Sequence, residues 1–263
     1  MGANRLRSLM GGGGTAVNAW LSADSGYIAE VLSHSGYDAV TVDLQHGMFG
    51  VDGAIRLLQA IDAGPAVPMA RAPSRDPAVI GKLLDAGAHG IVCPGVDTAE
   101  QAAAFVAACR YPPTGIRSYG PARAGVRGGP GYATDSGETV MTWAMVESAA
   151  ALEALEAILA VPGLDGVYVG PNDLALSLGV TPGLAVPPSE VDAALRRVVA
   201  EAHAAGVFAG VFCADGTAAR RMADLGYDLV TPGNDVALIR GAAAGHIGAV
   251  RGGSPRSPAS GGY

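Results

Sequence analysis

Eight short apolar segments alternate with eight helix-like segments along this chain, and this alternation constrains the fold more than any other feature. The apolar segments span residues 15–20, 38–43, 66–71, 90–94, 140–147, 166–169, 207–212 and 229–231. They are apolar at successive positions, as parallel strands covered on both faces are. The segments between them carry apolar residues at helical spacing, with Gly or Pro near many ends. They span residues 25–35, 51–63, 77–86, 98–110, 149–160, 189–205, 216–225 and 236–245.

Strict alternation over 263 residues predicts a single-domain α/β fold, the (β/α)8 TIM barrel. An open doubly wound sheet is the competing fold, but it normally carries a glycine-rich phosphate turn after its first strand. Here Leu21-Ser22-Ala23-Asp24 follows the first strand instead. We therefore expect a barrel over residues 15–250, between a flexible N-terminal tail (1–14) and a disordered, Gly/Ser/Pro-rich C-terminal tail (251–263).

Composition narrows the class of protein. The chain is 49% hydrophobic with a net charge of −7, so it is neither a disordered chain nor a dedicated nucleic-acid binder. No apolar run approaches the ~20 residues that span a membrane. The first ten residues lack the apolar core of a signal peptide, and the three cysteines show no paired spacing. These features predict a cytoplasmic protein with free thiols and no membrane contact.

One connection is unusually long. Residues 111–138 contain Pro, Gly, Arg and Tyr with little periodicity. Such a loop in a compact domain is usually functional or contacts a partner, although a mobile insertion is the alternative. We expect its arginines, Arg117, Arg123 and Arg127, to be solvated or to meet an anionic substrate, and the loop to influence which substrate is accepted.

Polar residues stand at the ends of several predicted strands. Asp43 ends the second strand and His46 follows it, Arg71 ends the third, Glu147 ends the fifth, and Asp173 follows the sixth. Active sites of (β/α)8 barrels form at the C-terminal ends of the strands. We therefore expect these five side chains to converge on one mouth.

The two acidic residues suggest a metal site. Glu147 and Asp173, without Cys or His at ligand spacing, suit a hard divalent cation such as Mg2+ or Mn2+. Two protein ligands leave coordination positions for water and a chelating substrate, whose ketone the cation can polarise. The alternatives are a charge at a helix N-terminus for Glu147 and a helix N-cap for Asp173.

The basic residues suggest complementary roles. His46 beside a carboxylate can act as a base near neutral pH. Arg71 can pair with a substrate carboxylate or an enolate oxygen, or else with a neighbouring barrel carboxylate. Trp20 and Met145 should pack in the mouth. Lys82 is the sole lysine and lies on a predicted helix, so Schiff-base chemistry is not expected.

Four motifs in order carry a family resemblance. They are VDLQHG (42–47), LDAGAHGI (84–91), RYPP with GIRS (110–113 and 115–118) and VGPNDLA (169–175). Together, from about residue 20 to 245, the chain resembles the HpcH/HpaI family of class II, metal-dependent pyruvate aldolases, which includes 2,4-dihydroxyhept-2-ene-1,7-dioate aldolases. The resemblance implies a carbon–carbon lyase that forms a pyruvate-type enolate and adds it reversibly to an aldehyde, or cleaves 4-hydroxy-2-oxo acids.

The resemblance also implies a site and an assembly. The cation, Mg2+ or Mn2+ with Co2+ or Zn2+ as further candidates, would sit on Glu147 and Asp173. Proton removal would fall to a hydroxide on the cation or to His46, assisted by Asp43 or Asp85. Asp85 would reach a neighbouring subunit's site in a homo-oligomer, a hexamer built as a trimer of dimers with the last helix exchanged. Substrate-binding positions would be Trp20, Arg71, Gly170, Pro171 and Asn172.

Position 145 departs from the family. Relatives commonly carry Gln two residues before the metal-binding Glu, whereas this chain has Met145, which lacks an amide for hydrogen bonding. Two further enzymatic readings use related chemistry: an acyl-CoA lyase of the citrate lyase β-subunit type, and a 2-oxo acid decarboxylase or synthase. A non-enzymatic barrel is disfavoured because Glu147, Asp173, Arg71 and His46 are all present.

Overall fold

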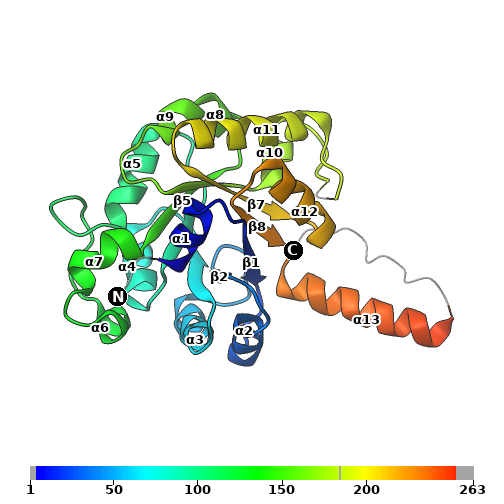
Figure 1. Ribbon diagram of the computed structural model, residues 1–263, viewed down its shortest axis with the longest axis horizontal. Helices are drawn as coiled ribbons and strands as arrows, with labels where there is room; N and C mark the ends of the chain where they lie inside the picture. The colour runs from blue at the N-terminus through cyan, green and yellow to red at the C-terminus, as the bar shows by residue number, and fades with distance from the viewer. Residues whose placement is uncertain (1–3, 184, 253–263) are drawn as a thin grey trace.

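The chain closes eight parallel strands into a barrel, in sequence order, and so confirms the predicted fold (Figure 1). The computed structural model describes residues 4–183 and 185–252. The strands are β1 (Ala16–Leu21), β2 (Ala39–Asp43), β3 (Val67–Arg71), β4 (Gly90–Cys93), β5 (Met141–Val146), β6 (Gly166–Val169), β7 (Phe208–Cys213) and β8 (Leu229–Pro232). All residues of β2 to β6 are buried, which explains their unbroken apolar sequences.

Helices surround this barrel. They are α1 (Arg5–Gly11), α2 (Gly26–Ser33), α3 (Val51–Asp62), α4 (Pro77–Asp85), α5 (Ala99–Ala108), α6 (Ala122–Gly128), α7 (Tyr132–Thr139), α8 (Ala149–Glu153), α9 (Leu155–Leu159), α10 (Pro171–Ser177), α11 (Ser189–Ala204), α12 (Gly216–Leu225) and α13 (Asp235–Arg251). One apolar core lies between strands and helices, and a second fills the barrel interior. The interior core is the floor on which the mouth residues stand.

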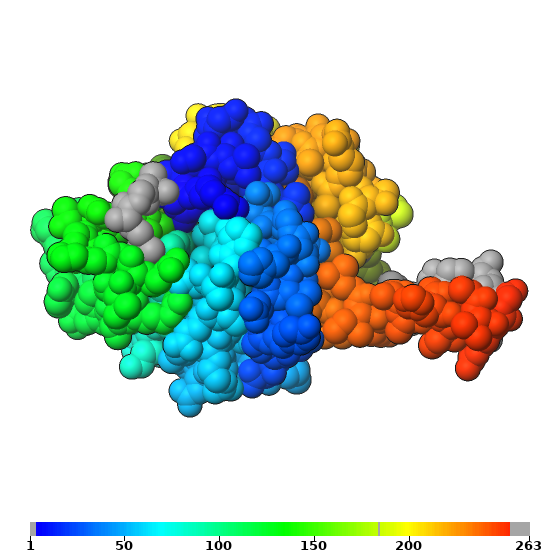
Figure 2. Space-filling model, turned by 60° about the horizontal axis from the view of Figure 1, so that its bottom comes forward, coloured from blue at the N-terminus to red at the C-terminus, as the bar shows by residue number. Residues whose placement is uncertain are grey.

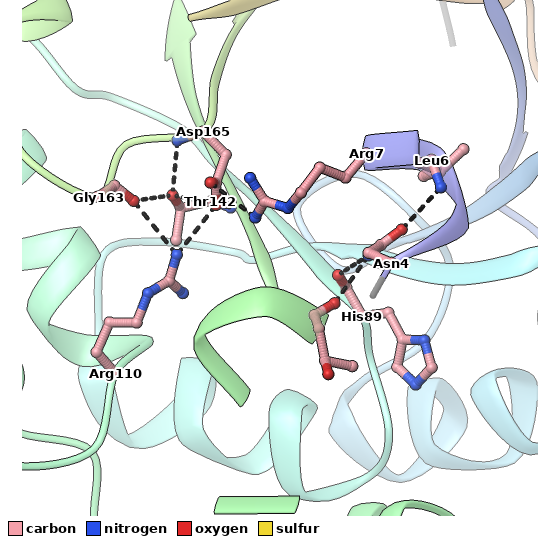
Figure 3. A network of polar contacts seen from close by, with 9 residues as sticks. Asn4, Leu6, Arg7, His89, Arg110, Thr142, Gly163 and Asp165 are labelled. Atoms are coloured by element: carbon pink, nitrogen blue, oxygen red, sulfur yellow. Dashed lines mark hydrogen bonds and ion pairs between the residues drawn. The ribbon is translucent and has the colours of Figure 1, made fainter. Parts of the chain in front are cut away.

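Helix α1 corrects the expected N-terminal tail. Its Leu6 and Met10 belong to the interior core, so the helix closes the end of the barrel opposite the mouth. Asn4 donates two hydrogen bonds to backbone carbonyl groups, of His89 (2.9 Å) and Thr139 (2.8 Å). Figure 3 shows these bonds beside Asp165, which pairs with an arginine of α1 and with Arg110. Tertiary contacts thus order a segment whose glycine run suggested flexibility.

The long connection is also ordered. Residues 122–139 form α6 and α7, and the connection runs from α5 to β5, so it lies at the N-terminal ends of the strands, opposite the mouth. The expectation that it shapes substrate choice is therefore wrong for the mouth of its own chain. Its arginines are paired: Arg117 is buried against Asp85, and Arg123 and Arg127 both pair with Asp62.

The last helix stands away from the barrel. Figures 1 and 2 show α13 projecting as an arm, and Asp235 is its one buried residue in the described part of the chain. The Asp235 carboxylate accepts hydrogen bonds from the backbone N–H groups of Ser22 and Ala23, which fixes the direction in which the helix leaves. Over the described residues, no helix is long and apolar enough to cross a membrane. The expected C-terminal tail lies outside them, apart from Arg251 and Gly252.

Candidate active site

A buried ion pair forms the centre of the mouth. Arg71, at the end of β3, donates through Nε to Asp43 Oδ1 (2.8 Å) and through Nη2 to Asp43 Oδ2 (2.6 Å). Trp20, near the end of β1, donates its indole N–H to the same Oδ2 (3.0 Å) and lies beneath the guanidinium, 5.0 Å from ring centroid to Cζ. Arg71 is only 2% exposed and Asp43 is fully buried. Neighbouring parallel strands thus bring together three of the predicted residues.

The pair assigns different roles to its two members. Burial acts to raise the pKa of Asp43, but the hydrogen bonds and charge of Arg71, with further bonds from Trp20 and the His46 backbone, outweigh it and lower that pKa. A carboxylate held this way is a poor proton acceptor and a good anchor. Arg71 therefore forms an ion pair with a neighbouring barrel carboxylate, which was one of the two roles considered for it. The anchored guanidinium still carries its charge at the mouth.

His46 lies on the loop after β2 with its side chain exposed. Its backbone N–H donates to Asp43 Oδ1 (3.3 Å), as does that of Gln45 (3.1 Å). Asp43 therefore fixes the loop through the backbone N–H groups of Gln45 and His46. The imidazole stands on the rim of the mouth, where a substrate or a second subunit can reach it.

The two acidic residues form the second part of the site. Glu147 directly follows β5, and its Oε1 accepts a hydrogen bond from the backbone N–H of Gly95 (2.7 Å). Burial is the main reason why the pKa of Glu147 is raised, and the negative charges of Asp173 and Asp97 raise it further, against the Gly95 bond and the charge of Arg71. Two carboxylates that repel one another in a half-buried site are stabilised when a cation binds between them.

The donor set defines what such a cation would meet. Asp173 is exposed in the first turn of α10, whose N-cap is Gly170, so the N-cap alternative for Asp173 is wrong. In the part of the chain that the structure describes, no three His, Cys, Asp or Glu side chains are arranged to hold a metal. Glu147 and Asp173 would thus be the protein ligands, and the other positions suit water and a chelating substrate.

Gly170 and Met145 shape the wall beside Glu147. A Cβ placed on Gly170 would lie 3.1 Å from Met145 Cε and 3.3 Å from Glu147 Oε2, so this glycine leaves space that a side chain would crowd. Met145 points to the same side of β5 as Glu147, is 2% exposed, and packs in the interior core with Trp20. Pro171 and Asn172 follow in the first turn of α10. The wall is therefore apolar at position 145, where the family resemblance predicts the amide group of a Gln.

Asp85 is not near these residues within the chain. It ends α4, which runs from the mouth to the opposite end of the barrel, and it accepts a hydrogen bond from Arg117 Nη2 (2.7 Å). That arginine lies over the ring of Tyr111 at 4.5 Å. A role for Asp85 at a mouth would thus need a second copy of the chain.

The sequence did not lead us to expect one group of the site, the backbone N–H of Gly95. The backbone N–H of Gly95 holds Glu147, and this residue has a φ of +64°, a conformation that glycine adopts readily. The signal available in the sequence was a Pro-Gly pair directly after β4, that is, at a strand end where barrels build their sites.

Fold and site together define a class: a (β/α)8-barrel enzyme with an anchored arginine and two acidic side chains at the mouth, suited to a small anionic substrate. Comparison with known proteins makes the class specific. Residues 17–242 match the family described as HpcH/HpaI aldolase/citrate lyase. The chain belongs to this family, and it is an aldolase, a carbon–carbon lyase.

Named relatives agree. A hydroxypyruvate/pyruvate aldolase of Rhizorhabdus wittichii is 41% identical over 91% of this chain and 96% of its own. A 4-hydroxy-2-oxovalerate aldolase of Rhodococcus jostii is 42% identical over 79% and 82%. The crystal structure of an HpcH/HpaI aldolase/citrate lyase family protein from Burkholderia cenocepacia superimposes with a TM-score of 0.87 at 34% identity, over 94% of this chain and 98% of its own.

Proposed function

We propose that this aldolase is of class II and forms the enolate of pyruvate or a close 2-oxo acid. The enolate adds reversibly to an aldehyde, and in reverse a 4-hydroxy-2-oxo acid is cleaved. The observation that carries the proposal is the pair of mutually repelling carboxylates, Glu147 and Asp173, beside the anchored guanidinium of Arg71. The names of the relatives, which refer to pyruvate and 4-hydroxy-2-oxo acids, support the substrate class.

Glu147 and Asp173 would hold the divalent cation, Mg2+ or Mn2+, since hard oxygen ligands suit these ions. When bound, the cation would supply Lewis-acid polarisation of the keto group. The chain's own contribution is preorganised. Gly95 fixes one Glu147 oxygen, and the Asp43 clamp fixes Arg71 where negative charge develops on the substrate oxygen.

Proton transfer falls to His46 in this proposal. The imidazole takes a proton from the methyl group of the 2-oxo acid, and the electron pair of the C–H bond forms the enolate double bond. The enolate carbon then attacks the aldehyde carbon, and the resulting alkoxide takes up a proton. Trp20 forms the floor beneath Arg71, while Gly170, Pro171 and Asn172 border the substrate space beside Glu147.

Assembly into a homo-oligomer is part of the proposal. A groove of about 410 Å³ remains on the outside of β1, β8 and α12, where the last helix of a barrel normally packs. Helix α13 instead exposes Leu238, Ile239, Ile247 and Val250, whereas helices in proteins are stabilised mostly by packing of such an apolar face. We infer that α13 of a second copy fills the groove, in a dimer that further assembles into a hexamer. In such an assembly Asp85 of one subunit would approach His46 of another.

We also propose a cytoplasmic location. Cys93, Cys109 and Cys213 are all buried and free, and burial raises the pKa of each thiol. Unreactive free thiols are usual in a reducing compartment. Localisation of the tagged chain by fractionation checks this.

The test is deuterium uptake into the methyl group of pyruvate in D2O, followed by NMR. It is run after chelation, with Mg2+ or Mn2+ restored, and with Glu147→Ala; Glu153→Ala, which removes an exposed carboxylate from α8, is the matched control. We expect exchange that needs the cation, that falls about 100-fold or more in Glu147→Ala, and that the control retains. Absence of exchange with every cation would overturn the proposal, and cleavage of an acyl-CoA or CO2 release from oxaloacetate would then identify the related chemistries.

A further inference from the structure

Four polar side chains are buried inside the barrel, directly beneath the mouth. Thr231 Oγ1 accepts hydrogen bonds from the Tyr168 hydroxyl (2.7 Å) and from Asn18 Nδ2 (2.9 Å). Thr41 Oγ1 donates to Asn18 Oδ1 (2.9 Å). None of the four is more than 1% exposed. We call these residues, Thr41, Asn18, Thr231 and Tyr168, the buried polar chain.

Burying these polar groups in an otherwise apolar core costs free energy, because each group loses its hydrogen bonds to water and must replace them with bonds to a protein partner. The position of the buried polar chain gives a reason for their burial. Asn18 lies two residues before Trp20 on β1, and Thr41 lies two residues before Asp43 on β2, so each pair points to the barrel interior, one layer apart. The polar layer is therefore the layer on which the ion pair of the mouth rests.

Tyr168 connects the two layers. Its hydroxyl belongs to the buried polar chain, and its ring stacks on Trp20 with centroids 5.6 Å apart and planes inclined by 25°. Trp20 holds Asp43 through its indole N–H and lies under the Arg71 guanidinium. A continuous series of contacts thus runs from Thr231 through Tyr168 and Trp20 to Asp43 and Arg71.

Gly210 on β7 makes this arrangement sterically feasible. A Cβ at that position would lie 2.7 Å from Tyr168 Cδ2. The absence of a side chain therefore lets the tyrosine ring lie flat against the strand on one side and against Trp20 on the other. Any group added at position 210 would push the ring toward Trp20.

We propose that Tyr168 and Thr231 are positioning residues for Arg71. Their hydrogen bond fixes the tyrosine ring, the ring fixes the Trp20 indole, and the indole fixes the Asp43–Arg71 pair at the orientation that meets the 2-oxo acid. This inference rests on the proposed function, in which Arg71 meets that substrate. Small displacements of such a group are expensive, since a misplacement of about 1 Å can cost about 100-fold in rate.

The test uses two hydroxyl deletions and a matched control. Tyr168→Phe and Thr231→Val break the bond that fixes the tyrosine ring. Thr41→Val deletes an equally buried hydroxyl at the other end of the buried polar chain, where Thr41 Oγ1 donates to Asn18 Oδ1. The readouts are the Kd of oxalate, a planar mimic of the pyruvate enolate, by calorimetry with Mg2+, KM and kcat for pyruvate deuterium exchange, and Tm.

We expect Tyr168→Phe and Thr231→Val to weaken oxalate binding about 10-fold and to raise KM for pyruvate by a similar factor. Thr41→Val should lower Tm by about as much as Tyr168→Phe and Thr231→Val do, but its oxalate Kd should stay within twofold of the wild-type value. Gly210→Ala, which displaces the ring without removing a hydrogen bond, should weaken oxalate binding as well.

The outcomes separate this inference from the proposed function. If oxalate does not bind the wild-type chain, or binds equally to Arg71→Lys, the proposed function fails and the inference with it. If Arg71→Lys weakens oxalate binding but Tyr168→Phe and Thr231→Val behave like Thr41→Val, only the positioning role is overturned.

Discussion

At the mouth, the backbone N–H of Gly95 holds Glu147 by a hydrogen bond, and the backbone conformation at position 95 explains why this residue is a glycine. With a φ of +64°, position 95 suits glycine, and a Cβ there would meet the strain of the left-handed region, about 1–2 kcal/mol. A change of backbone conformation at this position would displace the N–H group that now donates to Glu147 Oε1. We therefore expect Gly95→Ala to lower the free energy of unfolding by about 1 kcal/mol or more and to weaken Mn2+ binding several-fold.

A second glycine is the control for this prediction. Gly81 lies inside α4, and a Cβ there would have no atom within 4 Å. Gly81→Ala should raise the free energy of unfolding by about 0.5–1 kcal/mol and leave the cation affinity unchanged. Urea unfolding and titration of Mn2+ followed by electron paramagnetic resonance measure both quantities. Equal stabilisation by both substitutions would contradict the strain argument.

Glu147 makes the stability of the cation-free chain depend on pH. Burial and the neighbouring charges of Asp173 and Asp97 raise its pKa, so the folded chain binds this proton more tightly than the unfolded chain. The stabilising effect is complete below the ordinary pKa of a glutamate and is lost as the pH rises through the raised pKa. Asp43 acts in the opposite direction, because its pKa is lowered and its stabilisation is lost in acid.

Glu147→Gln should therefore stabilise the cation-free chain at pH 7, by about 1 kcal/mol or 2–4 °C in Tm. The difference should vanish below the ordinary pKa of glutamate, where the wild-type side chain is also neutral. With Mg2+ present, the wild-type chain should gain stability that the variant does not. Differential scanning calorimetry at pH 4 and pH 7 checks this, and a destabilised variant at pH 7 would refute it.

At the scale of elements, the side chain of Asn4 is the main contact that fixes α1 to the barrel. Asn4 caps the helix by accepting from the Leu6 backbone N–H (3.0 Å) and donates to two backbone carbonyl groups of the barrel. Its replacement by Ala removes all three bonds. The His89 carbonyl keeps the bond from the Met141 backbone N–H, whereas the Thr139 carbonyl loses its bond from Asn4. We expect Asn4→Ala to cost about 2 kcal/mol, whereas Arg5→Ala, which removes an exposed side chain of the same helix, should change stability by less than about 0.5 kcal/mol.

Urea unfolding measures the prediction for α1, and the oxalate Kd gives a second readout. Asn4 lies at the end of the barrel opposite the mouth, so its loss should be independent of substrate binding. An oxalate affinity that falls together with the stability would show that the two ends of the barrel are coupled.

The elements also show what the sequence could predict. All eight strands were located because a buried parallel strand is a local apolar signal. Helices α1, α6, α7 and α10 were not predicted. Tertiary contacts hold two of them: those of Asn4 and Arg7 at α1, and those of Arg117 and Arg123 around α6. At the mouth, the rule of strand ends located Asp43, Arg71 and Glu147. The Gly95 amide and the Tyr168 contacts depend on packing between strands, for which a single sequence carries no local signal.

At the scale of the whole molecule, α13 has a directional apolar stripe. Ile239, Ala243, Ile247 and Val250 recur at helical spacing on one face, and Arg240 and Arg251 flank this stripe on one side. A monomer would expose this stripe, and burial of one isoleucine contributes about 1.5–3 kcal/mol. Since the groove beside β1 and β8 lies on the same chain's barrel while the helix points away from it, a second copy meets both needs at once.

Ile239→Gln should thus weaken the proposed dimer at least about 10-fold, because it places an amide on the stripe that this dimer would bury. Arg240→Gln, which yields the same residue one position along at the charged edge of the stripe, should leave the proposed dimer intact. Sedimentation velocity over a range of concentrations gives the dissociation constant, and pyruvate exchange by the same samples shows whether activity follows assembly. Asp85 is far from the mouth of its own chain, so activity should fall with dilution of Ile239→Gln. Full activity of a monomeric Ile239→Gln would instead show that each barrel is complete by itself and that Asp85 has no catalytic part.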